Sequence, residues 1–165
     1  MIERVLHPYQ LEKALRHVIA NKGSAGVDGI SVGEIRKIFT EKKQQLIEQI
    51  KTGNYQVQPI LGIEIPKGNG KTRLLGIPTT TERVLQQSVA QNLAVLFEPE
   101  FSAYSYGFRP NKNARQAVGQ AREYIHQGLN HIVDTDLKNF FDEVDHCLLL
   151  NLVYQKVKCK TTMQL

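Results

Sequence analysis

The stretch ILGIEIPKGNGKTRLLGIP, residues 60–78, decides the fold class of this chain. Two β-prone runs flank the turn-forming residues Gly68, Asn69 and Gly70, which is the pattern of a β-hairpin. Apolar residues at helical spacing precede and follow the hairpin. The sequence therefore predicts an α/β protein of the α+β type, in which helices surround a short antiparallel hairpin.

The tip of the predicted hairpin is basic. Lys67, Lys71 and Arg73 cluster there, and the spacing of Lys67 and Arg73 would let them face each other across the turn. Such a pair could grip a triphosphate, with the lysine as a point charge and the arginine as a bidentate fork. Charges at a hairpin tip also serve simply to blunt an exposed edge. These residues alone leave both interpretations open.

Helices are predicted on both sides of the hairpin from capping residues, glycines and apolar periodicity. Their predicted limits are Pro8 to Gly23, Ser31 (with Glu34 in a capping box) to Gly53, Thr79 (with Glu82 in a second capping box) onward, and Asn111 to Gly128. Their predicted buried positions are Leu11, Leu15, Val18, Ile19, Ile35, Ile38, Phe39, Leu46, Ile50, Val84, Leu85, Val89, Leu93 and Leu96.

The segment HIVDTDLKNFFDEVDH, residues 131–146, holds the best candidate for chemistry. A β-prone run begins at His131, and Asp136 lies at its predicted carboxyl end, with Asp134 on the same face. A carboxylate at that place could hold Mg²⁺, and a pair of such ions can drive a phosphoryl transfer. Acids there also commonly cap the next helix or remain solvated, and the segment alone does not decide.

Composition narrows the classes of partner. The formal net charge of +5 favours a polyanionic partner, because Lys and Arg that neutralise phosphates release counterions. Cys147 and Cys159 do not make a disulfide framework or a metal-binding pattern, so we expect reduced thiols and a cytoplasmic protein. No apolar run is long enough to predict a signal peptide or a membrane span.

Blocks of sequence spread along the chain resemble the N-terminal part of group II intron reverse transcriptases, also called maturases. The blocks are NKGSAGVDGIS at 21–31, IEIPKGNGKTRLLGIPTTTERVLQQ at 63–87, SYGFRPNKNARQAV at 105–118 and VDTDLKNFFDEVDH at 133–146. The glycine-rich block narrows the match, since many other reverse transcriptases lack it. The resemblance implies the helix-rich fingers of a right-hand polymerase, with the β-hairpin and the first strand of the palm sheet.

The resemblance also implies an organisation and an activity. We expect one compact unit, residues 1–165, made of an N-terminal extension (1–55), fingers (56–128) and the start of a palm (129–165). The activity is RNA-directed DNA synthesis, with an RNA template or intron RNA, a DNA primer and deoxynucleoside triphosphates as partners, and no membrane. Two Mg²⁺ ions are the cofactors of the complete enzyme.

Site residues follow from the resemblance position by position. Asp136 matches the first catalytic aspartate, a ligand of both metal ions, and the carbonyl of Leu137 would touch one of them. Phe141 matches the aromatic gate that crowds the 2′-hydroxyl of a ribonucleotide. Lys67 and Arg73 match the pair that contacts the incoming triphosphate.

The predicted RNA contacts come from two regions. The loop from Gly23 to Ser31 resembles a lid over the template, and the SYGFRP block offers aromatic and basic side chains that could stack on bases and meet phosphates. Aromatic residues at that spacing also commonly belong to a core. The residues predicted to meet RNA are Lys22, Gly23, Ser24, Gly26, Lys71, Arg109, Lys112 and Arg115, with Tyr104, Tyr106 and Phe108 as stacking candidates.

Departures from the family pattern limit the expected activity. The paired-aspartate motif that completes the metal site does not occur in residues 1–165, so we expect this portion to be inactive alone and Mg²⁺ to be absent from it. Asn113 stands where a serine is common. The alternatives are a noncatalytic RNA-binding module or remnant, and a relative from a retron or phage-defence system. An unpaired strand edge at Asp136 also predicts self-association.

Overall fold

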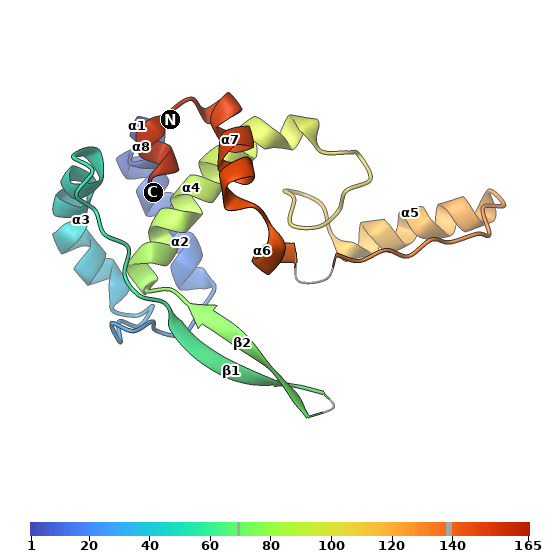
Figure 1. Ribbon diagram of the computed structural model, residues 1–165, viewed down its shortest axis with the longest axis horizontal. Coiled ribbons are helices and arrows are strands. Elements are labelled where there is room, and N and C mark those ends of the chain that lie inside the picture. Colours follow the sequence, from blue (N-terminus) through green and yellow to red (C-terminus); the bar gives the residue numbers. More distant parts are fainter. Residues whose placement is uncertain (69, 138–139) are drawn as a thin grey trace. The chain divides into compact units, whose positions relative to one another are not determined.

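A computed structural model of the chain describes residues 1–68, 70–137 and 140–165, without the side chains of Lys67 and Asp142. Helices dominate, and the predicted α+β class is confirmed (Figure 1). In chain order the elements are α1 (Ile2–Val5), α2 (Pro8–Ala20), α3 (Ile35–Lys51), β1 (Leu61–Lys67), β2 (Lys71–Ile77), α4 (Thr80–Phe97), the 3₁₀ helix η1 (Glu98–Glu100), α5 (Ala114–His126), α6 (Phe140–Glu143), α7 (His146–Val157) and α8 (Lys160–Met163).

The chain divides into two compact units where the sequence predicts one. The first unit consists of Met1–Leu93 and Leu152–Leu165, and the second of Ala94–Asn151. The functional division into extension, fingers and palm stays a prediction. Within the described parts of the chain, no helix is both long and apolar enough to cross a bilayer.

The core of the first unit is formed by one face of each of its long helices together with α1. Burying a leucine or isoleucine side chain stabilises a fold by roughly 2 kcal/mol, so this cluster is the main source of stability. Its buried members are Val5, Leu6, Leu11, Ala14, Leu15, Val18, Ile35, Phe39, Leu46, Ile50, Val84 and Leu85. Most of the predicted apolar positions are therefore confirmed, and the others are half-buried.

The N-cap of α5 is Asn113, two positions after the predicted cap, Asn111. The side chain of Asn113 accepts the N–H of Gln116 at 3.0 Å, and Gln116 Oε1 accepts the N–H of Asn113 at 2.9 Å, which is a complete capping box. Asn111 has φ 59 and lies outside the helix, so its predicted capping role is wrong. Serine and asparagine are both good N-caps, so the asparagine at position 113 suits this role.

The predicted capping box at α3 is only half present. Glu34 accepts the backbone N–H of Ser31 at 3.1 Å, but the Ser31 hydroxyl donates to the same carboxylate at 2.5 Å and does not cap the helix. These two bonds lower the pKa of the Glu34 carboxyl. The helix consequently begins at Ile35, after a turn.

Residues 131–137 form no strand, so the strand predicted to end at Asp136 is wrong for this structure. The sheet of the described residues contains β1 and β2 alone. A strand is stable only when a neighbouring strand accepts and donates its backbone hydrogen bonds, and none of the described residues forms such a strand beside this segment. Its apolar side chains are accordingly exposed, Ile132 by 78% and Val133 by 87%.

Candidate nucleotide and nucleic-acid interface

The basic residues of the hairpin occupy one face of it. Lys67 pairs with Lys71, and Arg73 lies two positions further along β2. Cross-strand partners share a face and positions two apart return to it, so these positions lie on the same side of the ribbon. Gly70, which directly precedes β2, has φ +71 and so supplies the left-handed backbone that a tight turn between the strands favours.

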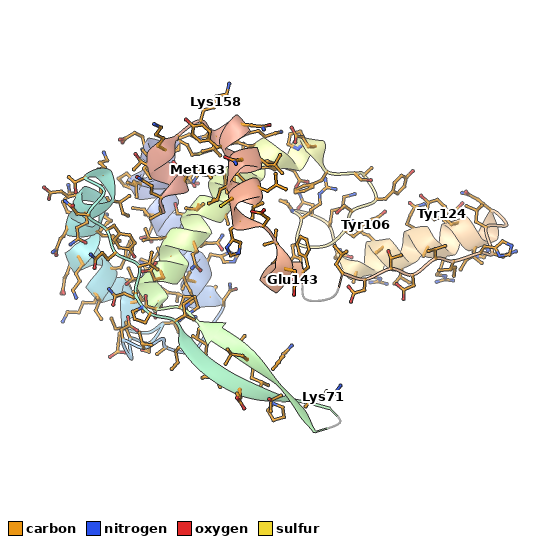
Figure 2. The ribbon with its side chains drawn as sticks, viewed as in Figure 1. Lys71, Tyr106, Tyr124, Glu143, Lys158 and Met163 are labelled. Atoms are coloured by element: carbon orange, nitrogen blue, oxygen red, sulfur yellow. The ribbon has the colours of Figure 1, made fainter. Side chains whose placement is uncertain are left out.

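The prediction that Lys67 and Arg73 face each other is wrong, because the cross-strand pairs that contain them are two positions apart. Arg73 is opposite Ile65, which makes Lys67 and Arg73 diagonal neighbours. Diagonal neighbours are about 7–8 Å apart, a distance that long side chains still bridge. Lys71 and Arg73 are exposed, and Figure 2 shows Lys71 at the tip. The side chain of Lys67 lies outside the described residues.

The glycine loop, residues 23–31, packs against the start of α4. A Cβ on Gly26 would lie 2.7 Å from Thr79 Cα and 2.9 Å from the carbonyl carbon of Pro78, so only glycine fits. A Cβ on Gly23 would overlap Arg83 Nη1. Gly26 is therefore needed for close approach to backbone atoms, a side chain at Gly23 would displace the end of the Arg83 side chain, and Gly29 at φ +67 has a backbone angle that favours glycine.

Hydrogen bonds hold the glycine loop in this position. The hydroxyl of Thr80 donates to the carbonyl of Ile30 at 2.5 Å, and Arg83 Nη2 donates to the carbonyl of Ser24 at 2.5 Å. The side chains of Lys22 and Ser24 are exposed beside these anchors. We therefore assign Gly23 and Gly26 to packing, and Lys22 and Ser24 to the surface that faces solvent.

The first turn of α4 also carries a buried carboxylate, Glu82, which is 4% exposed. Its Oε1 accepts the hydroxyl of Tyr55 at 2.6 Å and the N–H of Gln58 at 3.0 Å. Its own N–H donates to Thr79 Oγ1 at 3.2 Å, which is one half of the predicted capping box. Burial, reinforced by the Glu82 carboxylate, raises the pKa of the Tyr55 phenol well above its usual range.

Arg109 of the SYGFRP block holds its own loop together. Its Nε and Nη2 donate to Glu98 Oε1 at 3.1 and 2.8 Å, and its Nη1 donates to the carbonyls of Ser102 and Ser105. The guanidinium also lies over the ring of Phe101, 5.3 Å from its centre. With its donors engaged and its side chain 10% exposed, Arg109 serves the loop structure and is not displayed for a phosphate.

The aromatic residues of the same loop lie near the surface. Tyr104 is 62% exposed, and its ring is 6.0 Å from that of Tyr124 on α5, at an interplanar angle of 54° (Figure 2 labels Tyr106 and Tyr124). Lys112 donates to the carbonyl of Ala103 at 3.0 Å, and its Nζ lies 4.9 Å from the centre of the Tyr106 ring. This patch is therefore a cationic and aromatic surface, not a core.

Other predicted contacts of the second unit are exposed as well. Arg115 extends from the first turn of α5 without burial. Phe108 is fully exposed at φ 55, a backbone conformation that is uncommon for a bulky residue. Both side chains are free to meet a ligand, in contrast to Arg109.

The predicted catalytic segment is open to solvent. Asp134 and Asp136 are exposed, and Leu137 is 71% exposed. On α6, the side chain of Phe141 is 85% exposed, and its ring meets the ring of Phe140 edge-on at 5.4 Å between centres. Among the residues of this segment that the structure describes, these groups are open to solvent and so accessible to a substrate.

The segment around Asp136 offers oxygen donors of the type that Mg²⁺ binds, but too few of them. Mg²⁺ prefers oxygen ligands, which the Asp136 carboxylate and the Leu137 carbonyl provide. Among the described residues, however, no group of three or more His, Cys, Asp or Glu side chains could hold a metal ion. Asp136 and Leu137 alone are therefore too few donors for a metal site within the described residues.

Comparison with known proteins assigns the family. The model of the family described as reverse transcriptase (RNA-dependent DNA polymerase) matches residues 65–165. The chain belongs to the reverse transcriptase family. The matched region of this reverse transcriptase chain begins within β1 and includes the hairpin tip, the SYGFRP block and Asp136.

Curated relatives extend the match to the N-terminal region. The chain is 29% identical to protein YkfC of Escherichia coli over 95% of its length, and 33% identical to the group II intron-encoded protein LtrA of Lactococcus lactis over 98%. It is 32% identical to the putative COX1/OXI3 intron 2 protein of Saccharomyces cerevisiae over 88%. The predicted resemblance to group II intron reverse transcriptases is thus confirmed. The chain spans 43%, 27% and 16% of these relatives' own lengths.

The sequence did not reveal which residues of the reverse transcriptase chain join the start of α4 to the glycine loop and to the segment before β1. Thr80, Glu82 and Arg83 look like the polar side of an ordinary helix, yet each bonds to a distant segment. The available signal is a run of polar residues, TTTER at 79–83, at the start of a helix whose next turns are apolar. Such a run at a buried helix end must find hydrogen-bond partners.

Proposed function

We propose that residues 1–165 form the N-terminal part of a group II intron-encoded reverse transcriptase and maturase. The complete enzyme copies RNA into DNA and binds its intron RNA for splicing and mobility, and this portion alone does not polymerise. The observation that carries the proposal is the placement of the basic tip positions on one face of the hairpin, inside the region that matches the family.

The hairpin tip would bind the incoming nucleotide. Arg73 and Lys71 are exposed cations on the same face as the Lys67 position, so their charges can act together on a triphosphate. In this proposal Lys67 and Arg73 contact the phosphates. The exposed ring of Phe141 would crowd a ribose 2′-hydroxyl and so select deoxynucleotides.

The reacting phosphate would be held near Asp136. Its carboxylate and the Leu137 carbonyl would contribute ligands for Mg²⁺, which supplies charge neutralisation and activation of the primer hydroxyl when bound. Positioning of the nucleotide by the protein's own cations supplies the rest of the catalysis.

We propose RNA contacts in each unit taken by itself. In the first unit they are the exposed Lys22, Ser24 and Lys71, and in the second they are the half-buried Lys112 and the exposed Arg115. Most of these contacts are to phosphates, which hold the RNA regardless of its sequence. Tyr104 offers an exposed ring on which a base can stack.

Primer extension by the full-length enzyme tests the proposal. Asp136→Asn keeps the size of the side chain and removes its charge, and we expect it to reduce DNA synthesis by roughly a hundredfold or more. Asp134→Asn is the matched control, because Asp134 is also exposed and lies two residues away. Equal synthesis by the two variants would remove Asp136 from the catalytic site.

A noncatalytic RNA-binding role is the second candidate, favoured by the net charge of +5 and the exposed lysines. Affinity for RNA should then fall steeply as salt concentration rises, because each neutralised phosphate releases a counterion. Fluorescence anisotropy with this chain and a labelled RNA measures that slope. A salt-sensitive affinity together with inactivity of the full-length enzyme would favour this role over polymerisation.

A further inference from the structure

Both roots of the fingertip hairpin, residues 61–77, are tied to one residue of α4. The entering root is bonded to Glu82 through the hydroxyl of Tyr55 and the N–H of Gln58, shortly before β1 begins. The leaving root is bonded to Glu82 through Thr79, whose Oγ1 accepts the Glu82 N–H. Glu82 is thus bonded to the chain on both sides of the hairpin.

The chemistry of this connection makes it rigid. A carboxylate that is 4% exposed must keep its hydrogen bonds, since losing them would leave a buried charge without a partner. The bonds of Glu82 come from a phenol and a peptide N–H, and its place in the first turn of α4 adds the favourable field of the helix N-terminus. The hydrogen bonds to the buried Glu82 carboxylate therefore fix the positions of Tyr55 and Gln58.

The hairpin itself depends on its roots for its direction. Its strands are exposed over much of their length, with Ile63 41%, Leu74 75% and Leu75 42% exposed. In Figure 1 the ribbon of β1 and β2 extends away from α2, α3 and α4 of the same unit. A ribbon that is largely uncovered takes its orientation from the residues that fix its ends.

We propose that Glu82 is a positioning residue that sets the direction of the fingertip hairpin and thereby aligns Lys67 and Arg73 with the incoming nucleotide. The anchoring itself follows from the contacts of the first unit, while the alignment with a nucleotide rests on the proposed function. Arg83 and Thr80, in the same turn of α4, bond to the glycine loop and not to the hairpin. Side chains of one helical turn therefore fix two different segments.

Hydrogen exchange in this chain tests the anchoring. Glu82→Ala should speed amide hydrogen exchange of residues 55–77 by about tenfold. This corresponds to a tenfold rise in the fraction of molecules in which these amides are transiently open to solvent. Glu82→Gln retains an oxygen at Oε1 and should restore most of the protection. Tyr55→Phe removes only the hydrogen bond from the phenol to the Glu82 carboxylate. It replaces Glu82→Ala in this test if Glu82→Ala does not fold.

Thr80→Val is the matched control for Glu82→Ala. It removes a hydroxyl of the same helical turn, bonded to Ile30 at 2.5 Å, and should speed exchange in residues 23–31 while leaving the hairpin protected. Tyr9→Phe controls for Tyr55→Phe, because Tyr9 is 67% exposed. The same hairpin exchange in Glu82→Ala and Thr80→Val would overturn the anchoring role.

Steady-state kinetics of the full-length enzyme test the alignment. Tyr55→Phe and Glu82→Ala should raise the KM for deoxynucleotides about tenfold with a smaller change in kcat, whereas Thr80→Val should not. A loosened hairpin with an unchanged KM would overturn the positioning role. Absence of DNA synthesis by the wild-type enzyme would contradict the proposed function alone, because the exchange difference supports or overturns the anchoring without reference to synthesis.

Discussion

Arg109 Nη2 lies 2.8 Å from Glu98 Oε1, and this ion pair closes the loop that carries the SYGFRP block. The two residues are 11 positions apart, and the Arg109 side chain is 10% exposed. Charge-assisted bonds of a shielded arginine are strong and geometrically specific. The loop between η1 and α5 is therefore an ordered element of the second unit.

Arg109→Lys should destabilise this loop by about 2 kcal/mol, because a lysine cannot reproduce the bonds to both Glu98 and the backbone carbonyls. Limited proteolysis of residues 98–113 and urea unfolding measure the effect. Arg122→Lys, an exposed change on α5, is the control. Cleavage of both variants at the wild-type rate would contradict the structural role of Arg109.

Gly26→Ala should lower the free energy of unfolding by about 1–3 kcal/mol, because its Cβ would lie 2.7 Å from Thr79 Cα and the backbone must shift. Gly33→Ala is the control. Its Cβ would meet Ser31 Oγ at 3.7 Å, an ordinary contact. Thermal unfolding of the two variants should separate them, and equal melting temperatures would disprove the close packing of the glycine loop.

Glu12→Gln should change stability in a pH-dependent way. Hydrogen bonds from Arg16, and next from Arg36, lower the pKa of the Glu12 carboxyl from its ordinary value of 4.5. A lowered folded-state pKa stabilises the fold above the unfolded-state pKa, and this contribution is lost as pH falls through the folded-state pKa. Because both arginines are largely exposed, the effect should be about 0.5 kcal/mol.

Melting temperatures at about pH 7 and about pH 3 check this prediction. The wild-type chain should melt above Glu12→Gln at the higher pH, and the difference should shrink at the lower one. Glu41→Gln, an exposed change on α3, controls for the loss of one charge. A difference that grows on acidification would show that the sign is wrong.

Phe141→Ala in the full-length enzyme should relax discrimination against ribonucleotides roughly tenfold or more, because the ring that would clash with a 2′-hydroxyl is removed. The measurement is primer extension with matched ribo- and deoxynucleotides. Phe140→Ala is the control, since the two rings are in contact and only Phe141 is proposed as the gate. Unchanged selectivity in Phe141→Ala would exclude the gate.

The chain should self-associate through residues 131–137 at high concentration. An extended segment with Ile132 and Val133 exposed offers unpaired backbone groups to a second copy. Val133→Lys should weaken the association, because a charge blunts such an edge, and Leu129→Lys is the control. Sedimentation velocity that finds a wild-type monomer at every concentration would contradict the prediction.

The sequence predicted those elements well that depend on interactions between residues close together in the chain, such as helices and the hairpin turn. Apolar periodicity located α2, α3 and α4, and the Gly68 to Gly70 turn located the hairpin. Asn111 and Asn113 are chemically the same cap, and only the backbone angle of each, which a residue name does not encode, decides which one starts α5.

Non-local relationships were beyond the reach of the sequence. Tyr55 and Glu82 are 27 residues apart, and Thr80 and Ile30 are 50 apart, so no spacing rule connects them. The strand through Asp136 failed for a related reason, since strand formation needs a partner that the segment does not carry. The glycine loop shows the same limit, because Gly23 and Gly26 lie close to Arg83 and Thr79, which are more than 50 residues further along the chain.

The exposed hairpin also acts as a lever. Seven residues per strand at about 3.4 Å each give an arm of roughly 24 Å from root to tip. A tilt of roughly 5° at the root would move the tip by about 2 Å, and a misplacement of about 1 Å can slow a reaction a hundredfold. Small angular changes near Glu82 would therefore be amplified into larger displacements toward the tip of the hairpin, where Lys71 lies.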